Sequence, residues 1–374
     1  MELNNYKKTA LYDEHLKRGG KIVEFGGYLL PVEYTGIANE HFSVRENVGM
    51  FDVSHMGEIF VTGEKASEFL NYVLTCNSLK QDEYRMQYGL LLYDNGTFVD
   101  DLMIYKYNNQ KYLIVANASN TEKDYLWLCD CLSKYIKNND LDIKDVKIEN
   151  KSDLYGQIAL QGPNAYKILN SLSNIDFNQI KMYDFIECEI NGHMMIISRS
   201  GYTGGDGFEI YGFNKDIVNL FCLLNDNYNV TLCGLGCRDT LRFEGALPLY
   251  GHEISDQINP IMAGLNFACD YTKEFIGKES LLEYKQNQTK KLVGIELLDK
   301  GIARSEYEVL NKDEEVIGYI TTGYMIPGYN NSLAMALIDI NYSKINTEVF
   351  VRIRKKLAKA VVRDKKFMNK KYIK

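Results

Sequence analysis

The residues from Ser198 to Glu209 combine a glycine-rich backbone with side chains that can bind a ligand. Four glycines fall within seven positions, between an apolar run at 194–197 and an alternating run at 208–211. This pattern predicts a strand, a tight loop and a second strand, because glycine adopts backbone angles that strain other residues. The loop brings Tyr202 close to Glu209. A carboxylate accepts through two oxygens, so Glu209 can hold a flat edge with two parallel N–H donors, such as the 2-amino-4-oxo edge of a pterin.

Three further segments place polar groups beside apolar strands or glycine turns. Asp100 and Asp101 stand at the start of an otherwise apolar strand, where alternation points them to opposite faces, so at most one faces a shared pocket. Asn117 ends another strand with an amide, and Arg238 and Arg242 lie one turn apart on a helix after a glycine turn. Taken singly, each has a plain structural explanation: caps for the acids, solvated charges for the arginines and a loop position for the amide.

The composition excludes several classes of protein. The chain has 374 residues, of which 45% are hydrophobic and 25% are charged, as in a globular protein of two or three domains. A net charge of −7 argues against a nucleic-acid binder. The amino terminus lacks the apolar core of a signal peptide, and no apolar run approaches the ~20 residues of a membrane span. We therefore expect a soluble protein that contacts neither nucleic acid nor membrane.

The cysteines and histidines do not suggest a metal site. Eight cysteines are spread along the chain, mostly inside apolar segments, as expected of reduced thiols in a reducing compartment. Two close pairs, Cys129 with Cys131 and Cys233 with Cys237, lack metal-ligand spacing with nearby histidines. We expect no bound metal.

The remaining pattern predicts an α+β fold. Strands alternate with helices, but hairpins such as the one at Asp94-Asn95-Gly96 dominate, which favours mixed or antiparallel sheets over a doubly wound parallel sheet. After about residue 288, six short strands predict a small β-barrel. We therefore divide the chain into residues 1–287, with two interleaved α+β subdomains, and a C-terminal barrel domain, residues 288–374. Helices are expected over 9–19, 37–46, 65–75, 121–135 and 215–224.

In their order along the chain, these segments resemble the aminomethyltransferase family, the T-protein of the glycine cleavage system. The resemblance runs from about residue 6 to about residue 367 and rests on several motifs of five residues or more. Beside the glycine loop and the Asp-Asp-Leu segment, the motifs are Phe51-Asp52-Val53-Ser54-His55-Met56-Gly57-Glu58, Leu160-Gln161-Gly162-Pro163-Asn164-Ala165, Gly234-Leu235-Gly236-Cys237-Arg238-Asp239 and Leu249-Tyr250-Gly251-His252-Glu253.

The resemblance implies a three-domain cloverleaf with a central tetrahydrofolate site. It also implies the reaction, in which the aminomethyl group on the lipoyl arm of the glycine cleavage H-protein passes to tetrahydrofolate. The products are 5,10-methylenetetrahydrofolate, ammonia and the dihydrolipoyl carrier. Tetrahydrofolate is then a co-substrate, and the lipoylated H-protein is the partner. The implied compartment is the cytoplasm if the chain is bacterial, or the mitochondrial matrix if it is a processed eukaryotic protein.

The resemblance also carries over seven site positions, and it makes Asp101 the catalytic residue. Breaking the C–S or C–N bond of the aminomethyl carbon builds iminium-like positive charge, which a fixed carboxylate in a dry pocket stabilises. No serine, cysteine or histidine nucleophile is required. The other six positions are expected to bind or surround tetrahydrofolate: Tyr202, Glu209, Arg238, Met56, Tyr88 and Asn117.

Several positions depart from the family pattern, among them Gly205, Phe267, Glu306, Glu308 and the residues around Lys370. Phe267 stands where some relatives carry tryptophan. Lys370 lies near a position where relatives often carry arginine, and lysine offers the folate tail a point charge in place of a bidentate fork. Two other functions share the folate motifs, namely a tetrahydrofolate-dependent demethylase and a non-catalytic folate-binding protein. The presence of Asp101, and the lack of the Lys-Gly-Cys-Tyr-x-Gly motif of the non-catalytic relatives, argue against the last.

A basic run closes the chain. From Arg352 to Lys374 there are eleven basic residues and one acid, Asp364. A solvated terminal face explains such a run, but the run is also a candidate surface for an acidic lipoyl carrier or an anionic ligand tail.

Overall fold

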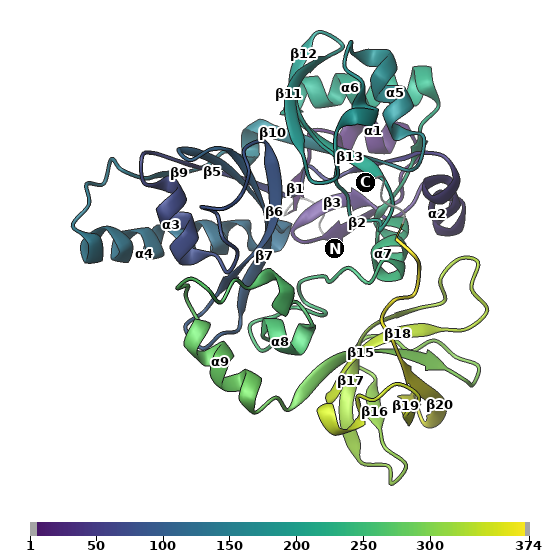
Figure 1. Ribbon diagram of the computed structural model, residues 1–374. Coiled ribbons are helices and arrows are strands. Elements are labelled where there is room, and N and C mark those ends of the chain that lie inside the picture. The colour runs from purple at the N-terminus through teal and green to yellow at the C-terminus, as the bar shows by residue number, and fades with distance from the viewer. Residues whose placement is uncertain (1–5, 371–374) are drawn as a thin grey trace.

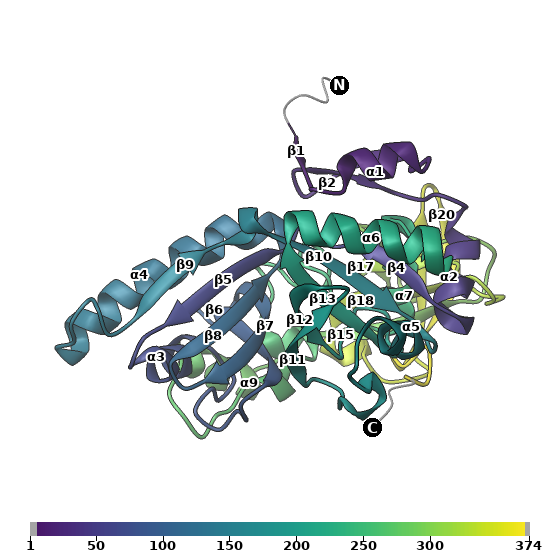
Figure 2. The same ribbon diagram turned by 90° about the horizontal axis from the view of Figure 1, so that it is seen from above.

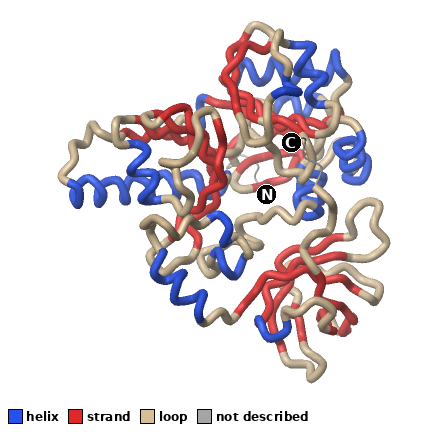
Figure 3. Tube along the Cα trace, in the orientation of Figure 1, coloured by secondary structure: helices blue, strands red, loops and turns tan. Residues whose placement is uncertain are grey.

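The protein, described over residues 6–370 by a computed structural model, has three lobes arranged around a common centre (Figure 1). The C-terminal lobe is almost entirely strand and loop, whereas the other two lobes carry the long helices (Figure 3). This arrangement confirms the predicted α+β cloverleaf with a C-terminal barrel. No helix among the described residues is long and apolar enough to cross a membrane.

The first lobe is built on a five-stranded sheet whose neighbouring strands are all antiparallel. One face packs on α3 (Ala66–Val73) and α4 (Thr121–Asn139) through a buried cluster that includes Phe69, Leu102 and Leu128. The predicted hairpin turn at 94–96 connects the first two strands in the order given next. The strand order is β6 (Arg85–Leu92), β7 (Phe98–Asn108), β8 (Lys111–Ala116), β5 (Gly57–Thr62) and β9 (Lys147–Asn150).

The second lobe has a mixed six-stranded sheet, with α5 (Ala165–Leu172) and α6 (Asn214–Tyr228) packed on it. Its strand order is β11 (Phe185–Ile190), β12 (His193–Ser198), β13 (Gly207–Phe213), β10 (Tyr155–Gln161), β4 (Gly49–Asp52) and β14 (Thr231–Leu232). The amino-terminal segment adds α1 (Tyr12–Lys17), α2 (Ile37–Glu46) and a small sheet of β1 (Lys7–Lys8), β3 (Tyr28–Pro31) and β2 (Ile22–Phe25).

The sheets of these two lobes meet through a shared aromatic cluster near the centre of the molecule. Tyr105 of the first sheet packs against Phe185 and Tyr211 of the second, and the hydroxyls of Tyr105 and Tyr211 are 2.8 Å apart. Figure 2 shows the two sheets from above, with β7 and β8 beside the strands of the second lobe. Side chains on these inner faces therefore come close together although they are about 100 positions apart in sequence.

The third lobe is a closed barrel filled by small and branched side chains such as Ile295, Ala336 and Val351. Two short helices, α8 (Pro260–Ala263) and α9 (Lys278–Gln286), precede it. The first barrel strand begins close to the predicted domain boundary at 287/288, which itself stays a prediction. The strand order is β15 (Lys290–Leu297), β18 (Leu333–Asp339), β17 (Val316–Tyr324), β16 (Glu308–Leu310), β19 (Glu348–Ile353) and β20 (Lys356–Arg363).

The basic run is partly neutralised by the barrel. Arg352 pairs with Glu308 over 2.7 Å, and Arg363 pairs with Glu296 over 2.8 Å. Lys355 and Lys356, at the turn between β19 and β20, are exposed and have no ion pair among residues 6–370. The last two lysines of the run, Lys371 and Lys374, lie outside the described residues.

Candidate active site

Asp101 lies near the start of β7 and is held by two side chains. The hydroxyl of Tyr88, on the neighbouring strand β6, donates to Oδ2 of Asp101 over 2.7 Å. The Nδ2 group of Asn117, just past the end of β8, donates to Oδ1 over 2.8 Å. Both carboxylate oxygens are therefore fixed, and three of the predicted site residues are joined by direct hydrogen bonds.

Asp100 points to the opposite face of the sheet, as strand alternation requires. It is fully buried on the side of α4, where its Oδ1 accepts from Nδ2 of Asn117 over 2.9 Å and from Nδ2 of Asn120 over 2.8 Å. Asn117 thus donates to both carboxylates and links their positions.

The surroundings of Asp101 favour a carboxylate that stabilises positive charge on a bound substrate. Burial, and after it the charge of Asp100, raise the pKa of Asp101 to about 7, while the hydrogen bonds from Tyr88 and Asn117 act in the other direction. A carboxylate that is poorly solvated interacts strongly with a cation formed beside it. The same pKa lets the group exchange a proton near neutral pH.

Glu209 lies on β13, on the sheet of the second lobe. The hydroxyl of Ser200 donates to Oε2 over 2.6 Å, whereas Oε1 has only a long contact of 3.4 Å with Nε2 of Gln157. Burial raises the pKa of Glu209, and Ser200 and Arg238 oppose the rise. Oε1 is thus the oxygen that can accept hydrogen bonds from a ligand.

Tyr202 and Arg238 stack on each other. The guanidinium carbon of Arg238 lies 4.7 Å from the ring centroid of Tyr202, whose hydroxyl donates to the carbonyl oxygen of Pro248. Burial raises the pKa of Tyr202, the charges of Arg242 and Arg238 lower it, and the charge of Asp101 raises it. A cavity of about 270 Å³ opens here, lined by residues that include Tyr202, Arg238, Leu249, His252 and Tyr324.

The two arginines on α7 (Leu235–Glu244) have different surroundings. The side chain of Arg238 has no hydrogen bond or ion pair within residues 6–370, and burial lowers its pKa. Arg242 is fully buried and donates to Glu253 over 2.8 Å, to Asp239 over 2.6 Å and to Thr322 of β17 over 3.1 Å. Arg238 is therefore available to a ligand, while Arg242 fastens the helix to the barrel.

The glycine loop is locked by an ion pair that sequence reasoning missed. Arg199 is buried, and its Nε and Nη2 atoms donate to the two oxygens of Asp206 over 2.9 and 2.8 Å. Two glycines shape this loop. Gly204 has a φ of +69°, which glycine adopts without strain, and Gly201 lies so close to the side chain of Gln161 that a Cβ would be 1.9 Å from its Oε1. The loop that carries Tyr202 is thus rigid.

The remaining predicted positions lie around these groups. Met56 packs between the aromatic cluster shared by the two sheets and a second cluster that includes Phe51 and Leu241. Phe267 is 77% exposed and stacks on Tyr88 with ring centroids 6.2 Å apart, so it is an open aromatic wall beside Asp101. Lys370 lines a separate pocket of about 460 Å³ formed by 244–246 and 365–370.

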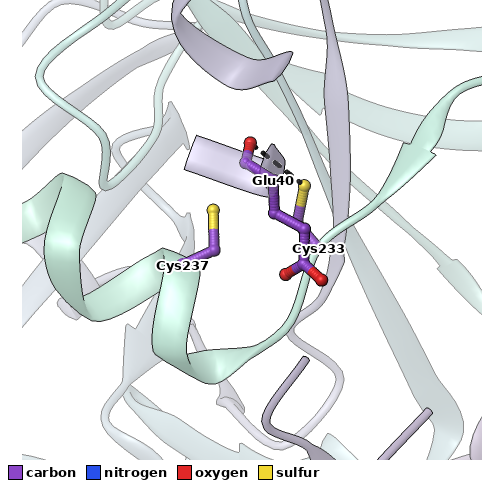
Figure 4. Close-up of side chains that lie close together, drawn as sticks. All are labelled: Glu40, Cys233 and Cys237. Carbon is purple, nitrogen blue, oxygen red and sulfur yellow. Dashed lines mark hydrogen bonds between the residues drawn. The ribbon is translucent and has the colours of Figure 1, made fainter. Parts of the chain in front are cut away.

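One buried group has potential metal ligands. Atoms of Glu40, Cys233 and Cys237 lie within 4.8 Å of one another (Figure 4). However, Oε1 of Glu40 already accepts from the backbone N–H groups of Tyr34 and Thr35, and Oε2 accepts from that of Gly234. We assign this carboxylate a structural role, and the lack of a metal stays a prediction. All eight cysteines are free thiols, as expected for a reducing compartment.

Comparisons with known proteins cover nearly the whole chain. The family described as GCVT N-terminal domain matches residues 11–273, and the glycine cleavage T-protein C-terminal barrel domain matches residues 290–369. An aminomethyltransferase of Lysinibacillus sphaericus is 46% identical over 364 residues, which cover 96% of each chain. An aminomethyltransferase of Staphylococcus carnosus is 44% identical over 371 residues, which cover 98% of this chain and all of the relative.

A solved structure agrees. The crystal structure of the glycine cleavage system aminomethyltransferase T from Bartonella henselae superposes with a TM-score of 0.90 at 29% identity, covering 98% of this chain and 99% of that one. These matches over nearly the whole chain define an aminomethyltransferase, consistent with a tetrahydrofolate-dependent one-carbon transferase. The chain belongs to the glycine cleavage T-protein family, the aminomethyltransferases. The family and the enzyme class predicted from the sequence are confirmed.

Proposed function

We propose that this enzyme transfers the aminomethyl-derived one-carbon unit from the lipoyl arm of a carrier protein to tetrahydrofolate. The products are 5,10-methylenetetrahydrofolate, ammonia and the dihydrolipoyl carrier. The observation that supports this most is the carboxylate of Asp101, whose two oxygens are fixed by Tyr88 and Asn117. Because the curated relatives are bacterial, we propose the bacterial cytoplasm as the compartment.

The proposed reaction balances without an added oxidant or reductant. The C–S and C–N bonds of the aminomethyl carbon break, and bonds from this carbon to N5 and N10 of tetrahydrofolate form. The two N–H protons of tetrahydrofolate go to the lipoyl sulfur and to the departing amine. Positive charge grows on the carbon between these events, and the carboxylate of Asp101 stabilises it. Tyr88 and Asn117 hold this carboxylate in one orientation.

The residues present fit the chemistry of tetrahydrofolate. Oε1 of Glu209 can accept from the pterin amino and N3–H groups, and Tyr202 offers an aromatic face. Arg238 adds donors that no residue among 6–370 uses. Lys365 and Lys370 provide cationic groups for a glutamyl tail in the pocket that they line.

The direct test is product formation from tetrahydrofolate and an aminomethyl-loaded lipoyl carrier. We expect 5,10-methylenetetrahydrofolate and ammonia in equal amounts. Folate binding without turnover would instead indicate a demethylase or a non-catalytic folate-binding protein, and a screen of methylated donors would separate these two.

Replacement of Glu209 by alanine should weaken tetrahydrofolate binding by about 10- to 100-fold, because a hydrogen bond to a charged group contributes roughly 1.5–3 kcal/mol. The measurement is a dissociation constant by calorimetry. Glu189→Ala is the matched control, because Glu189 is an exposed acid on β11 of the same sheet. An unchanged affinity in Glu209→Ala would show that the pterin binds elsewhere.

We also propose that the basic turn of the barrel docks an acidic lipoyl carrier. Reversing the charges of Lys355, Lys356 and Lys359 should raise the apparent KM for the carrier about 3- to 10-fold and leave tetrahydrofolate affinity unchanged. All three are exposed, and Lys359 has only a loose pair with Glu348 at 3.7 Å.

The matched control reverses three exposed lysines at the far end of the first lobe, Lys134, Lys137 and Lys144, one of which is also paired, with Asp130. Steady-state kinetics with varied carrier should distinguish the two variants. Equal KM values of the two variants for the carrier would show that this surface does not recognise the carrier.

A further inference from the structure

Asp124 lies in the first turn of α4, behind the sheet that carries Asp101. Its side chain is fully buried, yet neither carboxyl oxygen accepts a hydrogen bond from any donor among residues 6–370. A buried ionised carboxylate without donors has a large unfavourable desolvation free energy. Asp124 therefore cannot be an ordinary carboxylate.

The group that faces Asp124 is a second carboxyl group. Asn120, one helical turn before Asp124, donates to Oδ1 of Asp100, as does Asn117, and the charge of Asp100 acts on Asp124. A carboxylate is only an acceptor, so two of them share a hydrogen bond only when one carries a proton. Because Asp100 has the N–H donors and Asp124 has none, the proton resides on Asp124.

The charges around Asp124 agree with this state. Burial, and after it the charge of Asp100, raise the pKa of Asp124 to about 11, and the charge of Asp101 acts in the same direction. Lys123 is the nearby cation that opposes the rise. Its ammonium group is already used by the carbonyl oxygen of Val99 at 2.5 Å and the hydroxyl of Tyr250 at 3.0 Å.

We propose that Asp124 is a positioning residue, which as a neutral carboxylic acid donates to Asp100 and, through the amide of Asn117, holds Asp101 in its reactive orientation. The contacts form one continuous path, because Nδ2 of Asn117 donates to Oδ1 of Asp100 over 2.9 Å and to Oδ1 of Asp101 over 2.8 Å. The positioning role rests on the proposed function of Asp101, whereas the protonated state of Asp124 does not depend on it.

The protonated state is tested by Asp124→Asn, which keeps the shape and a hydrogen-bond donor. If Asp124 is neutral in the folded protein and ionised in the unfolded chain, the folded state binds the extra proton, and stability decreases as the pH rises above the ordinary carboxyl range. We expect the urea midpoint of Asp124→Asn to exceed that of the wild type at about pH 8, with a smaller difference at about pH 5. Infrared difference spectra should show the loss of one protonated carboxyl band. The same pH dependence in both proteins, with no such band, would overturn the proposal.

The positioning role is tested by comparing Asp124→Asn with Asp124→Leu, which fills a similar volume but donates nothing. We expect kcat within about 3-fold of the wild type for asparagine and a fall of about 10- to 100-fold for leucine, with the tetrahydrofolate affinity unchanged.

Equal kcat in the two variants would refute the positioning role. If Asp124→Leu does not fold, Asp124→Ala takes its place, and the stability and infrared tests of Asp124→Asn still apply. If the wild type itself transfers no aminomethyl unit, the proposed function fails, but those two tests still report the state of Asp124.

Discussion

Replacing Asp101 by asparagine should lower kcat by about 10²- to 10⁴-fold, while the dissociation constant of tetrahydrofolate stays within a few-fold. The asparagine has the shape of the native side chain; its one oxygen can accept from Asn117, and its NH2 group can donate to the hydroxyl of Tyr88. It lacks the negative charge, which matters only while the aminomethyl carbon is cationic. An interaction made only in the transition state changes kcat and not substrate binding.

The pH dependence of activity is a second test of the role of Asp101. Because the ionised form is the active one and the pKa of Asp101 is about 7, activity should be full above this pH and lost as the pH falls through it. Asp101→Asn should lack this limb in its residual activity. Asp94→Asn, an exposed acid in the hairpin turn before β7, is the control that should behave as the wild type. Normal turnover by Asp101→Asn would exclude Asp101 from the mechanism.

Replacing Asp206 by alanine should lower the free energy of unfolding by about 3–5 kcal/mol, because it leaves the guanidinium of Arg199 buried without its counter-ion. Arg199 would keep only carbonyl partners, among them Ile180 at 2.7 Å. Urea denaturation measures the change. The glycine loop should also loosen, so tetrahydrofolate affinity should fall in the same variant.

The control for Asp206→Ala is the removal of an exposed ion pair. Asp130 pairs with Lys134 over 2.8 Å, and its side chain is 52% exposed. Asp130→Ala should change stability by no more than about 1 kcal/mol. A similar small change in Asp206→Ala would show that water or a rearranged loop satisfies Arg199.

Local patterns in the sequence predict most of the fold. The α2 helix has the bounds expected from its apolar spacing, and the Asn95-Gly96 turn forms the predicted hairpin. The short strands β4 and β14 and the helix α9 were missed. The two strands exist because tertiary pairing selects them, since β4 is inserted between β10 and β14, and such partners do not show in a local pattern.

Asp101, Tyr88 and Asn117 form one hydrogen-bonded group, and Arg238 stacks on Tyr202, although the roles assigned to the site residues stay predictions. Strand alternation was enough to separate Asp100 from Asp101. It could not show that Asn117 binds both, because that contact depends on where β8 ends relative to β7. Ser200 was overlooked inside the glycine loop, although a hydroxyl two residues beyond a strand is a usable signal for a carboxylate partner. Asp124 carried no signal, because an acid in the first turn of a helix is ordinary.

The helix α7 serves two lobes at once. Arg238, on one turn of this helix, stacks on Tyr202. Arg242, on the next turn, donates hydrogen bonds to Thr322 of the barrel and to Glu253. A displacement of the barrel would therefore also move the helix that forms one wall of the cavity.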